Sequence, residues 1–117
     1  MDLFRQNPAA EAYIGTRLRS GRLVLHVAVA AETLTGIRDR AERRQFDALC
    51  DQTRTLIPSG ADWTLALRLC CGHARVSGTD WVDCLVAASA IRLGLPIATI
   101  NEKHFRPIKG LTVIRPY

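Results

Sequence analysis

The chain has 117 residues, of which 48% are hydrophobic and 23% are charged. This length and balance are typical of one folded domain with a real core, and they exclude an intrinsically disordered chain. No apolar run approaches the roughly 20 residues of a membrane-spanning helix, and no export signal is expected at the start. The net charge is +5, and fourteen of the sixteen basic residues are arginine. A polyanionic partner suits this charge, and a solvated arginine-rich surface explains it at least as well.

Local patterns predict the elements of the first half of the chain. Asn7 and Pro8 are a favourable N-cap and first helical residue, so a helix should begin there and end near Gly21. The elements expected after it are a buried strand over 23–27, helices over 28–37 and 41–53, and a strand over 54–57.

The second half continues this alternation. A helix is expected over 61–75, and a second helix should start with Thr79 as N-cap and stop at Gly94. The remaining elements are strands over 96–100 and 111–114, with a short helix or turn over 102–108 between them. Helices that alternate with short apolar strands indicate an α/β layer architecture with a parallel sheet. No repeat or linker interrupts the chain, so residues 1–117 are expected to form a single domain.

The four cysteines are not spaced like zinc ligands. Cys50, Cys70, Cys71 and Cys84 contain no C-x-x-C pair and no Cys/His run. Four reduced thiols in a cytoplasmic protein are therefore expected.

Two carboxylates lie in segments that are otherwise apolar. Asp83 belongs to a helix that is apolar on nearly every face, and Glu32 lies in the apolar run 27–34. A buried carboxylate costs several kcal/mol unless a cation or a good donor meets it. Each acid alone could cap a helix, pair with an arginine or lie at the edge of a buried face. Together they would be tolerated if Mg²⁺ or Mn²⁺ lay between them.

Asn101 is a third candidate ligand, because it directly follows the strand predicted over 96–100, where ligands of α/β sheets gather. A simple turn residue is an equally good interpretation. Asp80 lies one helical turn before Asp83, and its place at the start of a helix favours a structural role. The histidines His26, His73 and His104 show no ligand spacing and are expected to be structural or surface groups.

Segments 83–90 and 95–105, with the continuation 108–114, closely resemble the C-terminal half of VapC-like PIN domains. Residues 31–36 resemble the second acidic motif of this family. The resemblance implies a three-layer α/β/α domain with a short parallel sheet that cuts RNA with Mg²⁺ or Mn²⁺. It also implies homodimers and a tightly bound antitoxin. In this alignment Glu32 and Asp83 match the family's acidic residues, and Asn101 matches a position that carries Asp or Asn.

One departure concerns the first strand. The family begins with an apolar strand that ends in an Asp metal ligand, whereas residues 2–5 here resemble the segment directly after that strand. The first strand is therefore expected to be missing, together with one ligand and a central part of the sheet. Either the true start lies upstream, or the chain is a degenerate remnant.

The predicted function is a metal-dependent endoribonuclease, the toxin of a toxin–antitoxin pair. Glu32 and Asp83 would be the catalytic metal ligands, with Asn101 assisting. The alternative is a catalytically inactive PIN remnant that binds antitoxin or RNA without cleavage. A flavodoxin-like small-molecule-binding domain is a third interpretation, but it would need a glycine-rich phosphate loop that this sequence lacks.

Overall fold

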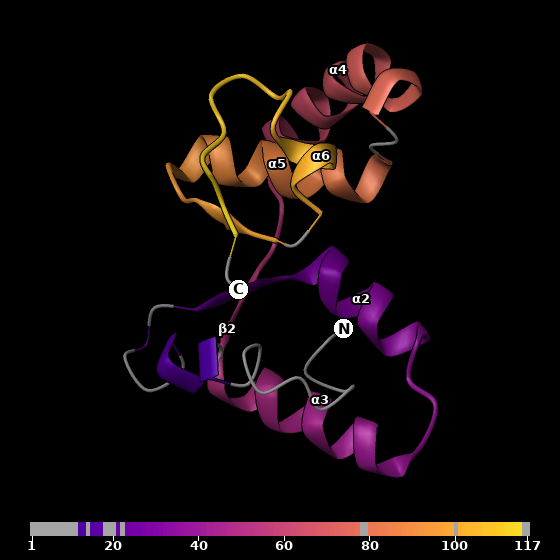
Figure 1. The fold of residues 1–117 in the computed structure, drawn as a ribbon, viewed down its shortest axis with the longest axis vertical. Coiled ribbons are helices and arrows are strands. Elements are labelled where there is room, and N and C mark those ends of the chain that lie inside the picture. The colour runs from indigo at the N-terminus through magenta and orange to yellow at the C-terminus, as the bar shows by residue number, and fades with distance from the viewer. Residues whose placement is uncertain are drawn as a thin grey trace. The chain divides into compact units, whose positions relative to one another are not determined.

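A computed structural model describes residues 12–13, 15–17, 21, 23–77, 80–99 and 101–115, apart from the side chains of 73–77 (Figure 1). The expected helix start at Asn7 and Pro8, and the expected cap Thr79, lie outside the described residues. The chain divides into two compact units. The first consists of Met1–Ile57 together with Tyr117, and the second consists of Pro58–Pro116. Among the described helices, none combines the length and the apolar character that crossing a bilayer requires.

The first unit contains a pair of parallel strands joined through two helices. In chain order its elements are β1 (Val24–His26), α2 (Val27–Thr35), α3 (Arg40–Gln52) and β2 (Arg54–Leu56). Strands β1 and β2 pair in the register Val24↔Arg54 to His26↔Leu56. Parallel strands need a crossover of a dozen or more residues, and α2 with α3 supplies it. The two predicted strands and two predicted helices are confirmed, with ends shifted by one or two residues.

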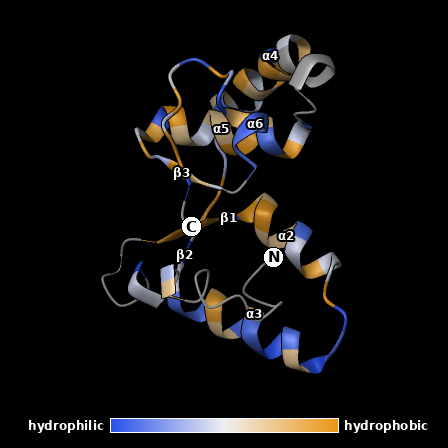
Figure 2. Ribbon diagram, in the orientation of Figure 1, coloured by the Kyte–Doolittle hydropathy of each residue, from blue (hydrophilic) through white to orange (hydrophobic). Residues whose placement is uncertain are grey.

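Both helices of this unit begin at capping residues. His26 is the N-cap of α2, where its Nδ1 accepts a hydrogen bond from the Ala28 backbone N–H at 3.1 Å, so its structural interpretation is confirmed. Asp39 caps α3 by accepting from the Glu42 backbone N–H. Helix α3 buries Phe46 and Leu49, and Figure 2 shows apolar and hydrophilic segments alternating along it, as in an amphipathic helix.

The second unit places two long helices before a second parallel strand pair. Its elements are α4 (Gly60–Ser77), α5 (Trp81–Leu93), β3 (Ile97–Ala98), α6 (Glu102–Phe105) and β4 (Val113–Ile114). Strand β3 pairs with β4 in the register Ile97↔Val113 and Ala98↔Ile114. The predicted elements are confirmed here too, although both strands are shorter than expected. Helices with short parallel strand pairs in both units confirm the predicted α/β class.

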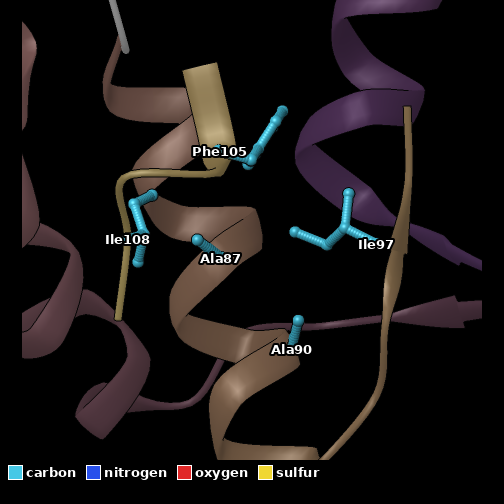
Figure 3. Packing of buried hydrophobic residues seen from close by; sticks show 5 residues of the cluster. All are labelled: Ala87, Ala90, Ile97, Phe105 and Ile108. Atoms are coloured by element: carbon cyan, nitrogen blue, oxygen red, sulfur yellow. The ribbon is translucent and has the colours of Figure 1, made fainter. Parts of the chain in front are cut away.

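The core of this unit forms around one face of α5. Ala87 and Ala90 point from α5 toward Ile97 on β3 and toward Phe105 and Ile108 (Figure 3). These five side chains are at most 8% exposed. Small alanine side chains let the strand and the segment around α6 approach the helix closely, so the core of the unit packs against α5.

All four cysteines are free thiols. Burial, together with the neighbouring Cys70, raises the pKa of the Cys84 thiol to about 12.

Gly94 ends α5 in the left-handed conformation, at φ 66°. The Gly94→Ala variant is expected to lose about 1 kcal/mol of unfolding free energy, because a side chain disfavours positive φ even where space is open. Gly72→Ala is the matched control in the interior of α4, where alanine should stabilise by about 0.5–1 kcal/mol. Urea titrations followed by circular dichroism measure both. Equal shifts in the two variants would contradict the conformational explanation.

Candidate functional site

The first turn of α5 carries a reciprocal pair of hydrogen bonds between two aspartates. The Asp83 backbone N–H donates to Asp80 Oδ1 at 2.9 Å, and the Asp80 backbone N–H donates to Asp83 Oδ2 at 3.3 Å. This capping box satisfies two backbone donors that the helix cannot use. The structural role predicted for Asp80 is confirmed, but Asp80 is the N-cap itself rather than a residue of the first turn. The prediction that Thr79 is the N-cap of this helix is therefore wrong.

His104 reaches the same carboxylate from helix α6. Its Nδ1 lies 3.3 Å from Asp83 Oδ2, and the two side chains are 26% and 21% exposed. A protonated imidazole at this position forms an ion pair with the carboxylate. The expectation that His104 is only a structural or surface group overlooked this contact. The two residues are 21 positions apart, and no local spacing reveals that the strand β3 brings α6 back to the start of α5.

The environment of Asp83 disfavours its negative charge. Burial raises the pKa of the Asp83 carboxyl, and the charge of Asp80 raises it further. The backbone N–H of Asp80 and the side chain of His104 oppose this effect. The hydrogen bond from the Asp80 backbone N–H and the ion-pair contact with His104 both involve Oδ2 of Asp83, and no partner of Oδ1 is found in the described part of the unit. An added cation would relieve this unfavourable charge.

Asn101 lies at the start of α6, beside His104 in the chain. Its backbone N–H donates to Thr99 Oγ1 at 3.0 Å, and its carbonyl oxygen accepts from the His104 backbone N–H at 3.1 Å. The Asn101 side chain makes no capping hydrogen bond and is exposed. The backbone of Asn101 is thus bonded to the turn that also carries His104, and His104 contacts Asp83.

Glu32 lies in the other unit, on α2, and it is exposed. The prediction that Glu32 is buried is wrong, because α2 has no buried residue within the described chain. The apolar composition of residues 27–34 suggested that Glu32 would be buried. Composition does not decide which side of a helix faces water, and Glu32 lies on the exposed side of α2. The juxtaposition of Glu32 with Asp83 stays a prediction.

Asp62 is a buried carboxylate that the sequence interpretation missed. It lies on α4, is 1% exposed, and accepts hydrogen bonds from Arg92 Nε at 2.6 Å and from Ser89 Oγ at 2.8 Å. The Ser59 backbone N–H donates to it as well, and Ser59 Oγ accepts in return from the Asp62 backbone N–H. The Arg92 guanidinium in particular holds the pKa of Asp62 well below its usual range. The S-x-x-D spacing before an apolar run, which marks a capping box, was the available signal.

Comparison of the two capping boxes separates a structural acid from a candidate functional one. Asp62 and Asp83 occupy the same position three residues after their N-caps. Both oxygens of Asp62 are taken by α5 side chains and a backbone donor, so it joins α4 to α5. The Asp83 carboxylate is 21% exposed, and the contacts found for it among the described residues involve Oδ2. Of these two acids, Asp83 is therefore the better candidate for a ligand.

Oxygen donors of this kind suit a hard divalent cation. A carboxylate and a side-chain amide are ligands that Mg²⁺ and Mn²⁺ accept, with waters at the other positions. Among the residues that the structure describes, no group of three or more His, Cys, Asp or Glu side chains is placed to hold a metal ion. The assignment of Asp83 and Asn101 as ligands of such a cation therefore stays a prediction.

Comparison with protein families identifies the family of the chain. The model of the PIN domain matches residues 1–111, which run through both compact units. The chain belongs to the PIN-domain family. PIN domains are in general nucleases, so the acid at the start of α5 lies in a chain of a hydrolase family. No curated protein matches the chain.

In this PIN domain, His104→Ala is expected to lower nuclease activity by roughly 10- to 100-fold, the usual effect of losing a partner that orients a metal ligand. The Mn²⁺ concentration for half-maximal activity should rise, while the melting temperature changes little because His104 is partly exposed. His104→Asn retains an N–H donor near the Nδ1 position and should recover part of the activity. Unchanged metal dependence in the alanine variant would contradict this role.

Proposed function

We propose that this PIN domain is a metal-dependent endoribonuclease and the toxin of a toxin–antitoxin pair, hydrolysing RNA phosphodiesters. The observation that carries the proposal is the Asp83 carboxylate, partly exposed at the end of a buried helix, with one oxygen held and the other open. Asp83 and Glu32 would be the catalytic metal ligands, and Asn101 would assist. Mg²⁺ or Mn²⁺ is the proposed cofactor.

Each residue near Asp83 has a separate part in this mechanism. A bound divalent cation supplies activation of water and polarisation of a phosphoryl oxygen. The Asp80 backbone N–H and His104 contact Asp83 Oδ2, so Oδ1 would be the oxygen that meets the cation. Lys103, the exposed neighbour of His104, would hold a phosphate of the RNA backbone. No side chain needs to act as a nucleophile.

The proposed partners depend on the same interpretation. The cognate antitoxin would inhibit by covering the acidic site, and a homodimer is the expected assembly. The cytoplasm is the expected place of action, since it holds the RNA substrate. The alternative is a PIN protein that binds antitoxin or RNA without cleaving, and the cleavage assay separates the two.

Incubation of the chain with total tRNA and with structured RNA tests the proposal. Cleavage is expected in Mn²⁺ or Mg²⁺ and should stop when EDTA removes the metal, because Asp83 alone cannot activate water. Asp83→Asn, purified in parallel, controls for a contaminating ribonuclease. Cleavage that persists in EDTA contradicts metal dependence, and absence of cleavage by folded protein favours the binding alternative.

A further inference from the structure

Two tryptophans form an exposed stacked pair on the second unit. Trp63 lies on α4 and Trp81 lies on α5, with ring centroids 6.3 Å apart and an angle of 15° between the ring planes. Trp63 is 53% exposed and Trp81 is 59% exposed. Indole rings are usually buried or at interfaces, and exposed aromatic surface of this size marks a binding site.

Both tryptophans lie beside residues of the two capping boxes. Trp81 is the first residue of α5, directly after Asp80, and Trp63 directly follows Asp62. Asp62 binds Ser89 and Arg92 of α5, which joins the two helices that carry the stacked rings. Binding on a preformed aromatic surface avoids the ordering cost that flexible side chains incur.

The pair shares the start of α5 with the candidate catalytic carboxylate. Trp81 and Asp83 are two residues apart on α5. Helix geometry places such side chains on opposite sides of a cylinder about 10 Å wide, with an axial offset of about 3 Å. A strand that is stacked on Trp81 would therefore have to pass around the start of the helix to reach Asp83.

The charge of this unit favours a nucleic acid as the occupant. Six basic side chains that the structure describes in this unit are exposed: Arg68, Arg92, Lys103, Arg106, Lys109 and Arg115. Among its described acids Asp62 is buried and Asp83 and Glu102 are partly buried, which leaves Asp80 as the exposed one. A surface that combines aromatic rings with exposed cations suits bases and phosphates together.

We propose that the Trp63–Trp81 pair is a stacking platform that binds unpaired bases of a nucleic acid. This inference rests on the proposed nuclease function and adds a binding site for its substrate. Every base presents a π face, so stacking gives affinity without strict sequence preference. Bases inside a duplex have both faces covered by their neighbours and cannot use the platform.

Binding measured in EDTA separates this inference from catalysis. Fluorescence anisotropy would compare a labelled, unstructured RNA oligonucleotide with the same strand annealed to its complement. Trp63→Leu and Trp81→Leu should each raise the Kd for the single strand by roughly 5- to 100-fold and leave duplex binding nearly unchanged. Trp81→Phe, which keeps an aromatic face, should retain most of the affinity. Leu67→Ala is the matched control, because Leu67 is an equally exposed apolar residue of α4 outside the pair.

A measurement on the wild-type chain guards against a variant that fails to fold. Intrinsic tryptophan fluorescence should be quenched by the single strand and not by the duplex. Absence of this quenching, or equal loss of affinity for both RNAs in the leucine variants, overturns the platform. A second result would also overturn the platform: leucine variants that bind RNA normally but have a different molecular mass by light scattering. That result would indicate that the tryptophan pair is a protein interface.

The failure of this inference can be told apart from that of the nuclease. If wild-type protein cuts RNA in Mn²⁺ and the tryptophan variants cut and bind equally well, the platform is wrong and the nuclease stands. If wild-type protein cuts nothing but binds single strands through the tryptophans, the platform stands and the nuclease is wrong.

Discussion

Replacing Arg92 by leucine is expected to lower the free energy of unfolding by about 2–3 kcal/mol, because the change leaves a buried carboxylate without its cation. The loss is smaller than for a fully buried pair, since Arg92 is 38% exposed and Ser89 still donates to Asp62. Asp62 is 1% exposed and receives two hydrogen bonds from Arg92, at 2.6 and 3.0 Å. A loss of this size is a large part of the roughly 5–15 kcal/mol that stabilises a domain. Urea denaturation followed by circular dichroism measures the change.

The two members of this pair should differ in their effects. Arg92 is 38% exposed, so after Asp62→Leu its guanidinium can turn toward water and the loss should be smaller than in Arg92→Leu. The double variant should lose less than the sum of the two single losses, because no charge is left unpaired. Arg43→Leu is the control, since its ion pair with Asp47 is exposed on both sides and contributes at most about 1 kcal/mol. Equal losses for Arg92→Leu and Arg43→Leu would contradict the argument.

The same pair predicts how stability depends on pH. Arg92 holds the pKa of folded Asp62 below its usual range, whereas unfolded aspartate titrates near about 3.9. The stabilisation is therefore present above about pH 4 and is lost as the pH falls toward the lower pKa of the folded state. Arg92→Leu should show a weaker loss on acidification than wild type, measured as melting temperature against pH. An identical acid profile for the two proteins would assign the acid sensitivity to other groups.

Asp83→Asn is expected to lower metal-dependent RNA cleavage by more than the roughly 10- to 100-fold that loss of a supporting residue costs, because it removes the proposed ligand itself. Stability should be kept or slightly increased. The asparagine oxygen can still accept from the Asp80 N–H, and the charge that burial disfavours is removed. Rates with labelled RNA in Mn²⁺, together with melting temperatures, measure both effects. A variant that stays fully active would show that Asp83 is no ligand.

Two further variants make this result specific. Asp80→Asn removes a neighbouring charge but keeps a good N-cap residue, so folding and most of the activity should be preserved. Glu32→Gln changes an exposed acid of the other unit and should reduce cleavage as Asp83→Asn does if both carboxylates hold one metal. Full activity in Glu32→Gln would confine the site to the second unit.

Local sequence was sufficient for the elements and for the α/β class. The apolar periodicities gave each described helix and strand to within a few residues, and Gly94 marked the end of α5 because its left-handed conformation is set by the chain itself. Asp83 also stood out from sequence, since a carboxylate in the apolar segment that becomes α5 is unfavourable wherever that helix packs. Helix and strand positions and the ends of helices depend mainly on residues that are neighbours in the chain, so they can be predicted without knowledge of the tertiary structure.

The tertiary structure alone decided which acids differ in role. Asp62 and Asp83 look alike in sequence, since each is the third residue of a helix. Arg92 and Ser89 bind the Asp62 carboxylate, whereas the described side chain that contacts the Asp83 carboxylate is His104. Those partners are 21 to 30 residues away, and their approach depends on how α4 and α6 pack on α5. The exposure of Glu32 and of the stacked tryptophans was equally hidden, because composition sets how apolar a helix is and packing sets which of its residues meet water.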